Sequence, residues 1–143
     1  MTASTGLGKS HLMTALGHAA CLRGHAVLYT GAIDIVNALA SAQAGGNVKR
    51  TLAHYVKPEL LWIDELGYLP IDKFGADGLF QIPSHRYERG ATLITTNRLY
   101  GQWAGIFNGD STLTAALLDR LLHHAETVTI EGRSFRTKDQ IEA

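Results

Sequence analysis

The residues best suited to do chemistry form a glycine-rich stretch near the start of the chain, TGLGKS at 5–10. The Walker A pattern needs a glycine, four further residues and then Gly-Lys-Ser/Thr. Gly8, Lys9 and Ser10 match its second half, whereas Ala3 occupies the first glycine position. Glycines let backbone N–H groups converge on phosphate oxygens, lysine supplies a mobile cation, and the serine hydroxyl can reach magnesium. The stretch predicts a triphosphate-binding loop; the alternative is a glycine-rich turn before a helix.

Two carboxylates follow an apolar run further along the chain, in the sequence LLWIDE at 60–65. A strand that is buried on both faces cannot carry charged residues along its length, but its carboxyl end can. There Asp64 could hold magnesium, and Glu65 could polarise an attacking water. Two solvated acids at the end of a strand are the alternative. The two motifs support each other, because both belong at the carboxyl edge of one sheet.

Polar residues also end the apolar run LITT, where Asn97 could orient the same water as Glu65. Asparagine is equally common as a turn residue that follows a strand, which is the alternative for Asn97. Arg120 lies among leucines in LLDRLLHH. It is either a surface arginine on an amphipathic helix, which the residues alone favour, or a cation that reaches a neighbouring subunit's nucleotide.

The hydrophobic pattern predicts the elements that would position these residues. Helices are expected at 10–23, 32–43, 48–56, 74–89 and 112–124, and strands at 26–30, 60–63, 91–96 and 126–130. Apolar strands that alternate with helices are typical of a parallel sheet with crossover connections, so the fold class is α/β. In the first helix, Leu12, Ala15, Leu16 and Ala19 are expected to face inward, and Pro83 should kink or divide the fourth.

Composition narrows the class of protein. The 143 residues suffice for one domain with one core. Lys+Arg 13 balances Asp+Glu 13, so no global field draws in nucleic acid. The single cysteine, Cys21, rules out an internal disulfide, and no apolar run has membrane-spanning length. We therefore expect a cytoplasmic protein that makes no membrane contact.

Any contact with DNA must come from local basic patches, because no base-reading module is recognisable. Eight candidates for phosphate contacts are Lys49, Arg50, Arg86, Arg89, Arg98, Arg133, Arg136 and Lys138. Most of them are expected to lie on ordinary solvated faces.

Five segments together resemble the IstB-type transposition helper ATPases, which are AAA+ proteins similar to the DnaC-type helicase loaders. The segments are TGLGKSHL, LLWIDELGYLP, FGADGLFQ, YERGATLITTNR and ALLDRLLHHAETVTIEGRSFR. The resemblance runs from Thr5 to about Glu142, and 117–135 is its most specific part. It implies a P-loop sandwich of three layers around a parallel sheet. It also implies binding of ATP and Mg²⁺, double-stranded DNA without sequence preference, a partner transposase and further copies of the chain.

The resemblance also implies roles for individual residues. The nucleotide-binding residues would be Thr5, Gly6, Leu7, Gly8, Lys9, Ser10 and His11. Magnesium would be held by Ser10 and Asp64. The catalytic residues would be Glu65, which activates water, Asn97 as first sensor, and Arg120 as an arginine finger that acts on a neighbouring subunit.

The chain departs from the family pattern at its start. Only 1–4 precede Thr5, too few for the central strand from which a P-loop hangs, and the family's helical DNA-binding segment is absent. We expect 1–143 to be one partial AAA+ domain without its first strand, from a truncated gene or a late start, with weak or absent ATP hydrolysis. Whether the chain is an enzyme stays open. The alternatives are a helicase loader, a non-catalytic interaction module and a small-molecule kinase.

Overall fold

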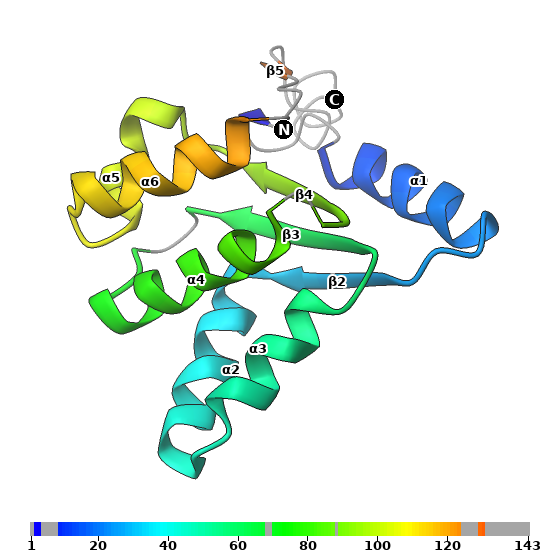
Figure 1. The fold of residues 1–143 in the computed structure, drawn as a ribbon. Coiled ribbons are helices and arrows are strands. Elements are labelled where there is room, and N and C mark those ends of the chain that lie inside the picture. Colours follow the sequence, from blue (N-terminus) through cyan, green and yellow to red (C-terminus); the bar gives the residue numbers. More distant parts are fainter. Residues whose placement is uncertain (1, 4–8, 68–69, 88, 124–128, 131–143) are drawn as a thin grey trace, which may run out of the picture.

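A five-stranded sheet forms the centre of the molecule (Figure 1). The computed structural model describes residues 2–3, 9–67, 70–87, 89–123 and 129–130. The strand order is β2-β3-β4-β1-β5, and every pair is parallel. The strands are β1 (Thr2–Ala3), β2 (Val27–Gly31), β3 (Leu60–Leu66), β4 (Ala91–Thr96) and β5 (Thr129–Ile130). The predicted α/β fold with a parallel sheet is confirmed.

Helices join these strands, and all five expected helices are present with ends shifted by at most three residues. They are α1 (Lys9–Leu22), α2 (Ala32–Gly45), α3 (Val48–Val56), α4 (Lys73–Arg86) and α6 (Ser111–Leu122). Two further short helices were not predicted, the 3₁₀ helix η1 (Tyr100–Gln102) and α5 (Trp103–Ile106). Gly101, Gly105 and the Asn108–Gly109 pair are typical of a loop, but Trp103 and Ile106 are buried and hold this segment against the core.

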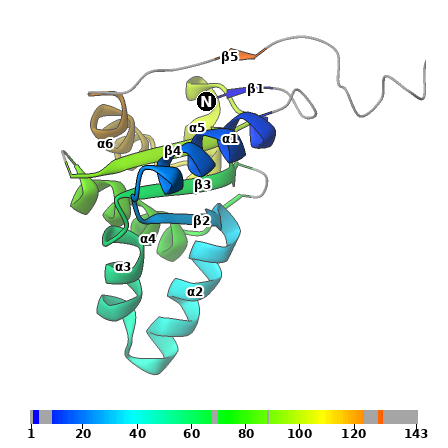
Figure 2. The ribbon, with the colours of Figure 1, turned by 90° about the vertical axis from the view of Figure 1, so that its right-hand side faces the viewer.

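The helices cover the sheet on both faces. Leu61 and Ile63 of β3 point into the main core, which α2, α4, α5 and α6 share. Side chains alternate along a strand, so Trp62 points to the opposite face, where α1 contacts β2, β3 and β4. Figure 2 shows α1 in front of the sheet and α4 to α6 behind it. The arrangement is the expected sandwich of three layers.

The inward face of α1 differs from the expected one. Leu12, Ala15, Leu16 and Ala19 are exposed, and the buried positions are Met13 and Gly17. The apolar residues of this helix extend around more than one side, so their spacing did not identify the side that meets the sheet. Gly17 packs beside Val27: a Cβ at this position would lie 3.9 Å from the Val27 side chain, an ordinary van der Waals distance.

The fourth helix runs without a break through Pro83, which was expected to kink or divide it. Pro83 lies in the last turn of α4 and is buried against the core. A proline there removes only one hydrogen bond close to the end of the helix, so packing outweighs the loss. The expected division is therefore wrong.

The position expected to lack a strand is occupied. Thr2 pairs in register with Thr96 of β4 on one side and with Thr129 of β5 on the other. Two residues are enough to join these strands, so the prediction that nothing before Thr5 forms a strand is wrong. The expected strand at 126–130 is described only as β5, since 126–128 lie outside the described residues.

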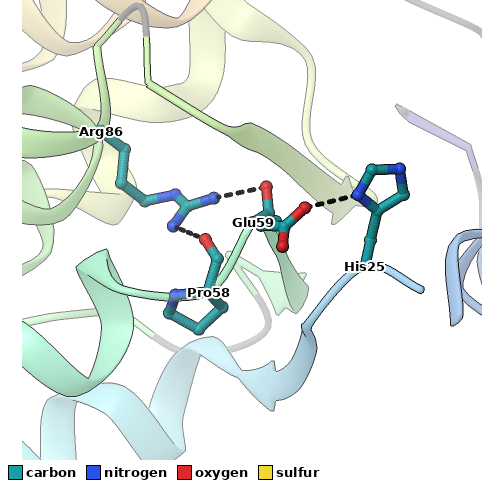
Figure 3. Close-up of polar contacts among 4 residues, drawn as sticks. All are labelled: His25, Pro58, Glu59 and Arg86. Carbon is teal, nitrogen blue, oxygen red and sulfur yellow. Dashed lines mark hydrogen bonds and ion pairs between the residues drawn. The ribbon is translucent and has the colours of Figure 1, made fainter.

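A buried arginine forms hydrogen bonds with the backbone at the amino ends of β3 and β4. Arg86, at the end of α4, is only 3% exposed, and this burial lowers its pKa. Its guanidinium donates to five backbone carbonyls and one hydroxyl: those of Tyr55, Val56, Pro58, Glu59, Ala91 and Thr92. Figure 3 shows two of these contacts beside the hydrogen bond between His25 Nδ1 and Glu59, whose N–O distance is 2.5 Å. Arg86 was a candidate for DNA contact, and that candidacy is wrong.

We expect Arg86→Met to destabilise the chain strongly, because it leaves several buried carbonyls without a donor. Each unsatisfied buried group costs about 1–3 kcal/mol, so a loss of at least ~3 kcal/mol in the free energy of unfolding is expected. Urea denaturation measures it, with Arg89→Met as the control at a neighbouring exposed arginine. Equal stability of the two variants would contradict this role for Arg86.

Candidate functional site

The candidate site is built on a β-bulge at the carboxyl end of β3. Ile63 pairs with Ile94, and the next pair is Leu66 with Thr96. Two residues of β3, Asp64 and Glu65, therefore lie opposite the single residue Thr95. The strand was expected to end before these acids, but it runs through both of them.

The bulge changes which face each side chain meets. Leu61 and Ile63 point into the main core, and without an extra residue Leu66 would point to the α1 face. Leu66 instead joins the core and is only 3% exposed. The bulge is accommodated at Glu65, whose φ of 59° lies in the left-handed region that glutamate rarely adopts. One unusual backbone angle thus lets an acidic pair interrupt a buried strand without the loss of its core contacts.

Asp64 is buried and held by hydrogen bonds from the strands on both sides. It is 6% exposed. Its Oδ1 accepts a hydrogen bond from the Thr95 hydroxyl, and its Oδ2 accepts one from the Tyr29 hydroxyl at 3.2 Å. The Tyr29 ring also meets Trp62 edge to face, with ring centroids 4.5 Å apart, which places Asp64 on the α1 face with Trp62. Burial, followed by the charge of Asp64, raises the pKa of Tyr29, so this hydroxyl stays a donor at neutral pH.

Glu65 and Asn97 lie at the same edge of the sheet. Glu65 is exposed, while its backbone N–H donates to the Thr95 hydroxyl at 3.1 Å. Asn97 follows β4 directly and is also exposed. Beside it, the Thr96 hydroxyl donates to the Leu66 carbonyl at 2.6 Å and accepts from the Arg98 N–H at 3.0 Å. The ends of β3 and β4 are thereby joined, and Asp64, Glu65 and Asn97 lie on adjacent strand ends.

The glycine-rich stretch is described only at its end. Thr5, Gly6, Leu7 and Gly8 lie outside the described residues, as do the side chains of Lys9 and Ser10. The backbone of Lys9 opens α1, and His11 in the first turn is exposed. Because the connection from β1 to α1 is short, α1 begins near the carboxyl ends of the parallel strands (Figure 2). Contact of Lys9 and Ser10 with a nucleotide stays a prediction.

Arg120 lies elsewhere. Its guanidinium carbon is 5.8 Å from the ring centroids of both Phe80 and Tyr87, on the exposed surface of α6. Tyr87 caps α4 just before β4 begins, at the edge of the sheet opposite Asp64. The described contacts therefore do not bring Arg120 to the acids of its own chain. Action on a neighbouring subunit stays a prediction.

The donors at this edge suit magnesium, which binds through one or two carboxylates together with phosphate oxygens. Asp64 offers one fixed carboxylate. The part of the chain that the structure describes contains no cluster of three or more His, Cys, Asp or Glu side chains able to hold a metal by itself. The remaining ligands of a magnesium ion bound to Asp64 would be water or phosphate oxygens. None of the described helices has both the length and the apolar character needed to cross a bilayer.

The whole chain, residues 1–143, matches the model of the IstB-like ATP binding proteins. The chain belongs to this family. It is similar to several insertion-sequence proteins that are named for ATP binding. The IS5376 protein of Geobacillus stearothermophilus is 41% identical over 94% of this chain and 53% of the relative. The IS21 protein of Pseudomonas aeruginosa is 37% identical over 96% of this chain and 52% of the relative. The chain thus spans about half the length of these relatives.

Solved structures show the same fold. The chain superposes on AMPPCP-bound DnaA from Aquifex aeolicus with a TM-score of 0.77 and 24% identity, over 99% of this chain and 43% of that one. The DnaC helicase loader gives a TM-score of 0.71 and 18% identity, over 91% and 76%. These likenesses show that the IstB-like chain shares its fold with DnaA and the DnaC helicase loader.

Two residues of the site were not assigned a role from the sequence. Tyr29 was counted only as part of an apolar strand, and Thr95 only as one of the polar residues that end β4. Both touch Asp64 because β2, β3 and β4 are neighbours in this register. A strand order with β3 between β2 and β4 would have pointed to Thr95, which lies opposite Asp64 and Glu65. Tyr29 pairs with Trp62 instead and reaches Asp64 through the length of its side chain.

Proposed function

We propose that this IstB-like chain binds ATP with magnesium between the start of α1 and the end of β3. The observation that carries the proposal is Asp64, a buried carboxylate held on the α1 face at the carboxyl end of β3. Ligands of open parallel sheets bind at this edge. The amides and side chains at Gly6, Gly8, Lys9 and Ser10 would hold the phosphates, and Ser10 and Asp64 would hold the metal.

Hydrolysis follows from the groups beside Asp64. Bound magnesium supplies charge neutralisation to the phosphates. The exposed Glu65 carboxylate would accept a proton from water as the water oxygen attacks the terminal phosphorus, and Asn97 would orient that water. The bond from this phosphorus to the bridging oxygen breaks, and ADP leaves. Arg120 lies against Phe80 and Tyr87 instead of these acids, so it would stabilise phosphoryl transfer in a neighbouring subunit. An isolated chain therefore hydrolyses ATP weakly.

The biological role that fits is a helper ATPase of DNA transposition, active in the cytoplasm. It would bind double-stranded DNA without sequence preference, assemble with other copies of itself and stimulate a partner transposase. The support is family membership and relatives that belong to insertion sequences. A DnaC-like helicase loader is the second candidate, favoured by the similar fold. Stimulation of a transposase, as against loading of a helicase, separates the two.

Lys9→Ala tests ATP binding. Loss of a charge-assisted hydrogen bond to phosphate costs about 1.5–3 kcal/mol, so the affinity should fall by roughly ten- to a hundredfold. Isothermal titration of ATP with magnesium measures it, and Lys49→Ala is the control at an exposed lysine of α3. If Lys9→Ala binds ATP as tightly as Lys49→Ala does, the chain has no P-loop site and is at most an interaction module.

Glu65→Gln tests hydrolysis. The amide cannot take a proton from water, so turnover should fall by about 10²–10⁴-fold while ATP binding is kept. Release of phosphate measures turnover in the presence of double-stranded DNA, and Asp77→Asn is the control at an exposed acid of α4. Undiminished phosphate release by Glu65→Gln would remove Glu65 from the mechanism.

A further inference from the structure

The Thr95 side chain makes two hydrogen bonds at the bulge. It is 0% exposed. Its hydroxyl hydrogen goes to Asp64 Oδ1, and its oxygen accepts from the Glu65 backbone N–H at 3.1 Å. One hydroxyl thus bonds the side chain of one acid and the backbone of the other. A threonine or serine can do both at once, because a hydroxyl is both donor and acceptor.

These two bonds stabilise an otherwise unfavourable backbone. The extra residue of a bulge has no ladder partner, so the Glu65 N–H would lack an acceptor without Thr95. A φ of 59° at a glutamate persists only where its surroundings hold it. The same bonds turn the Asp64 carboxylate to the α1 face and leave the Glu65 side chain in solvent.

We propose that Thr95 is the positioning residue of this site: its hydroxyl holds the bulge that aims Asp64 at the metal and frees Glu65 to activate water. The role rests on the proposed ATP site. Thr95 is fully buried, so it would act through the two acids that it bonds. Tyr29 supports Asp64 from the other side but has no contact with the Glu65 backbone among the described hydrogen bonds.

The test compares Thr95→Val, which keeps the shape and loses the hydroxyl, with Thr95→Ser, which keeps the hydroxyl. Thr114→Val is the matched control, because Thr114 is also buried, and its hydroxyl donates to the Asp110 backbone carbonyl at the start of α6, away from the bulge. The first readout is amide hydrogen exchange at Glu65 in the protein without ligand. We expect Thr95→Val to speed this exchange selectively, whereas Thr95→Ser and Thr114→Val leave it protected.

The second readout is the factor by which magnesium tightens ATP binding, measured by calorimetry with and without the metal. Loss of an interaction that orients a metal ligand costs about 10–100-fold in metal affinity or activity. We expect the factor by which magnesium tightens ATP binding to be about tenfold smaller in Thr95→Val and unchanged in Thr95→Ser. ATP affinity without magnesium should stay unchanged in both variants.

The outcomes separate the inference from the proposed function. Unchanged Glu65 exchange, or an unchanged magnesium effect, in Thr95→Val overturns the positioning role and leaves the ATP site standing. A loss shared equally by Thr114→Val would mean general destabilisation and also overturns it. If the unaltered chain shows no magnesium effect on ATP binding, the proposed function fails. Exchange at Glu65 then still decides whether Thr95 holds the bulge.

Discussion

The bulge at Asp64 and Glu65 is the feature on which the site depends. A buried parallel strand and an acidic pair make opposite demands: the strand needs apolar contacts on both faces, and the acids need polar partners and solvent. One extra residue reconciles them. It leaves Asp64 on the α1 face, puts Glu65 into solvent and returns Leu66 to the core. The hydrogen bonds of Thr95 give this irregular backbone its partners.

Two polar arrangements hold the two ends of the sheet, and they differ in kind. At the carboxyl ends, hydroxyls of Tyr29 and Thr95 surround a buried carboxylate. At the amino ends, Arg86 donates hydrogen bonds to backbone carbonyls, and no carboxylate pairs with it among the described residues. Carbonyl dipoles satisfy the buried cation there. The first arrangement leaves a carboxylate on the α1 face at the carboxyl ends of the strands, where ligands of open parallel sheets bind. In the second, backbone carbonyls surround the cation, so its role is structural.

Much of this arrangement was predictable from the sequence. The apolar runs before Asp64 and Asn97 predicted buried parallel strands, and parallel strands bring their carboxyl ends to one edge of the sheet. The bulge was not predictable, because LLWIDEL is equally consistent with a strand that stops at Ile63. Arg86 was misjudged, since arginine is normally exposed and only the fold shows the carbonyls around it. Hydrogen bonds of Tyr29 and Thr95 depend on strand order and register, which the hydrophobic pattern does not specify.

The central claim is that Asp64 and the start of α1 share one metal–triphosphate centre. Mn²⁺ in place of magnesium, added with a non-hydrolysable ATP analogue, tests it through paramagnetic broadening of backbone amide signals. The account predicts selective broadening at Gly8, Lys9 and Ser10 together with Asp64 and Glu65, and only when the nucleotide is present. Broadening at the glycine-rich stretch without the acids, or at the acids without the nucleotide, would contradict it.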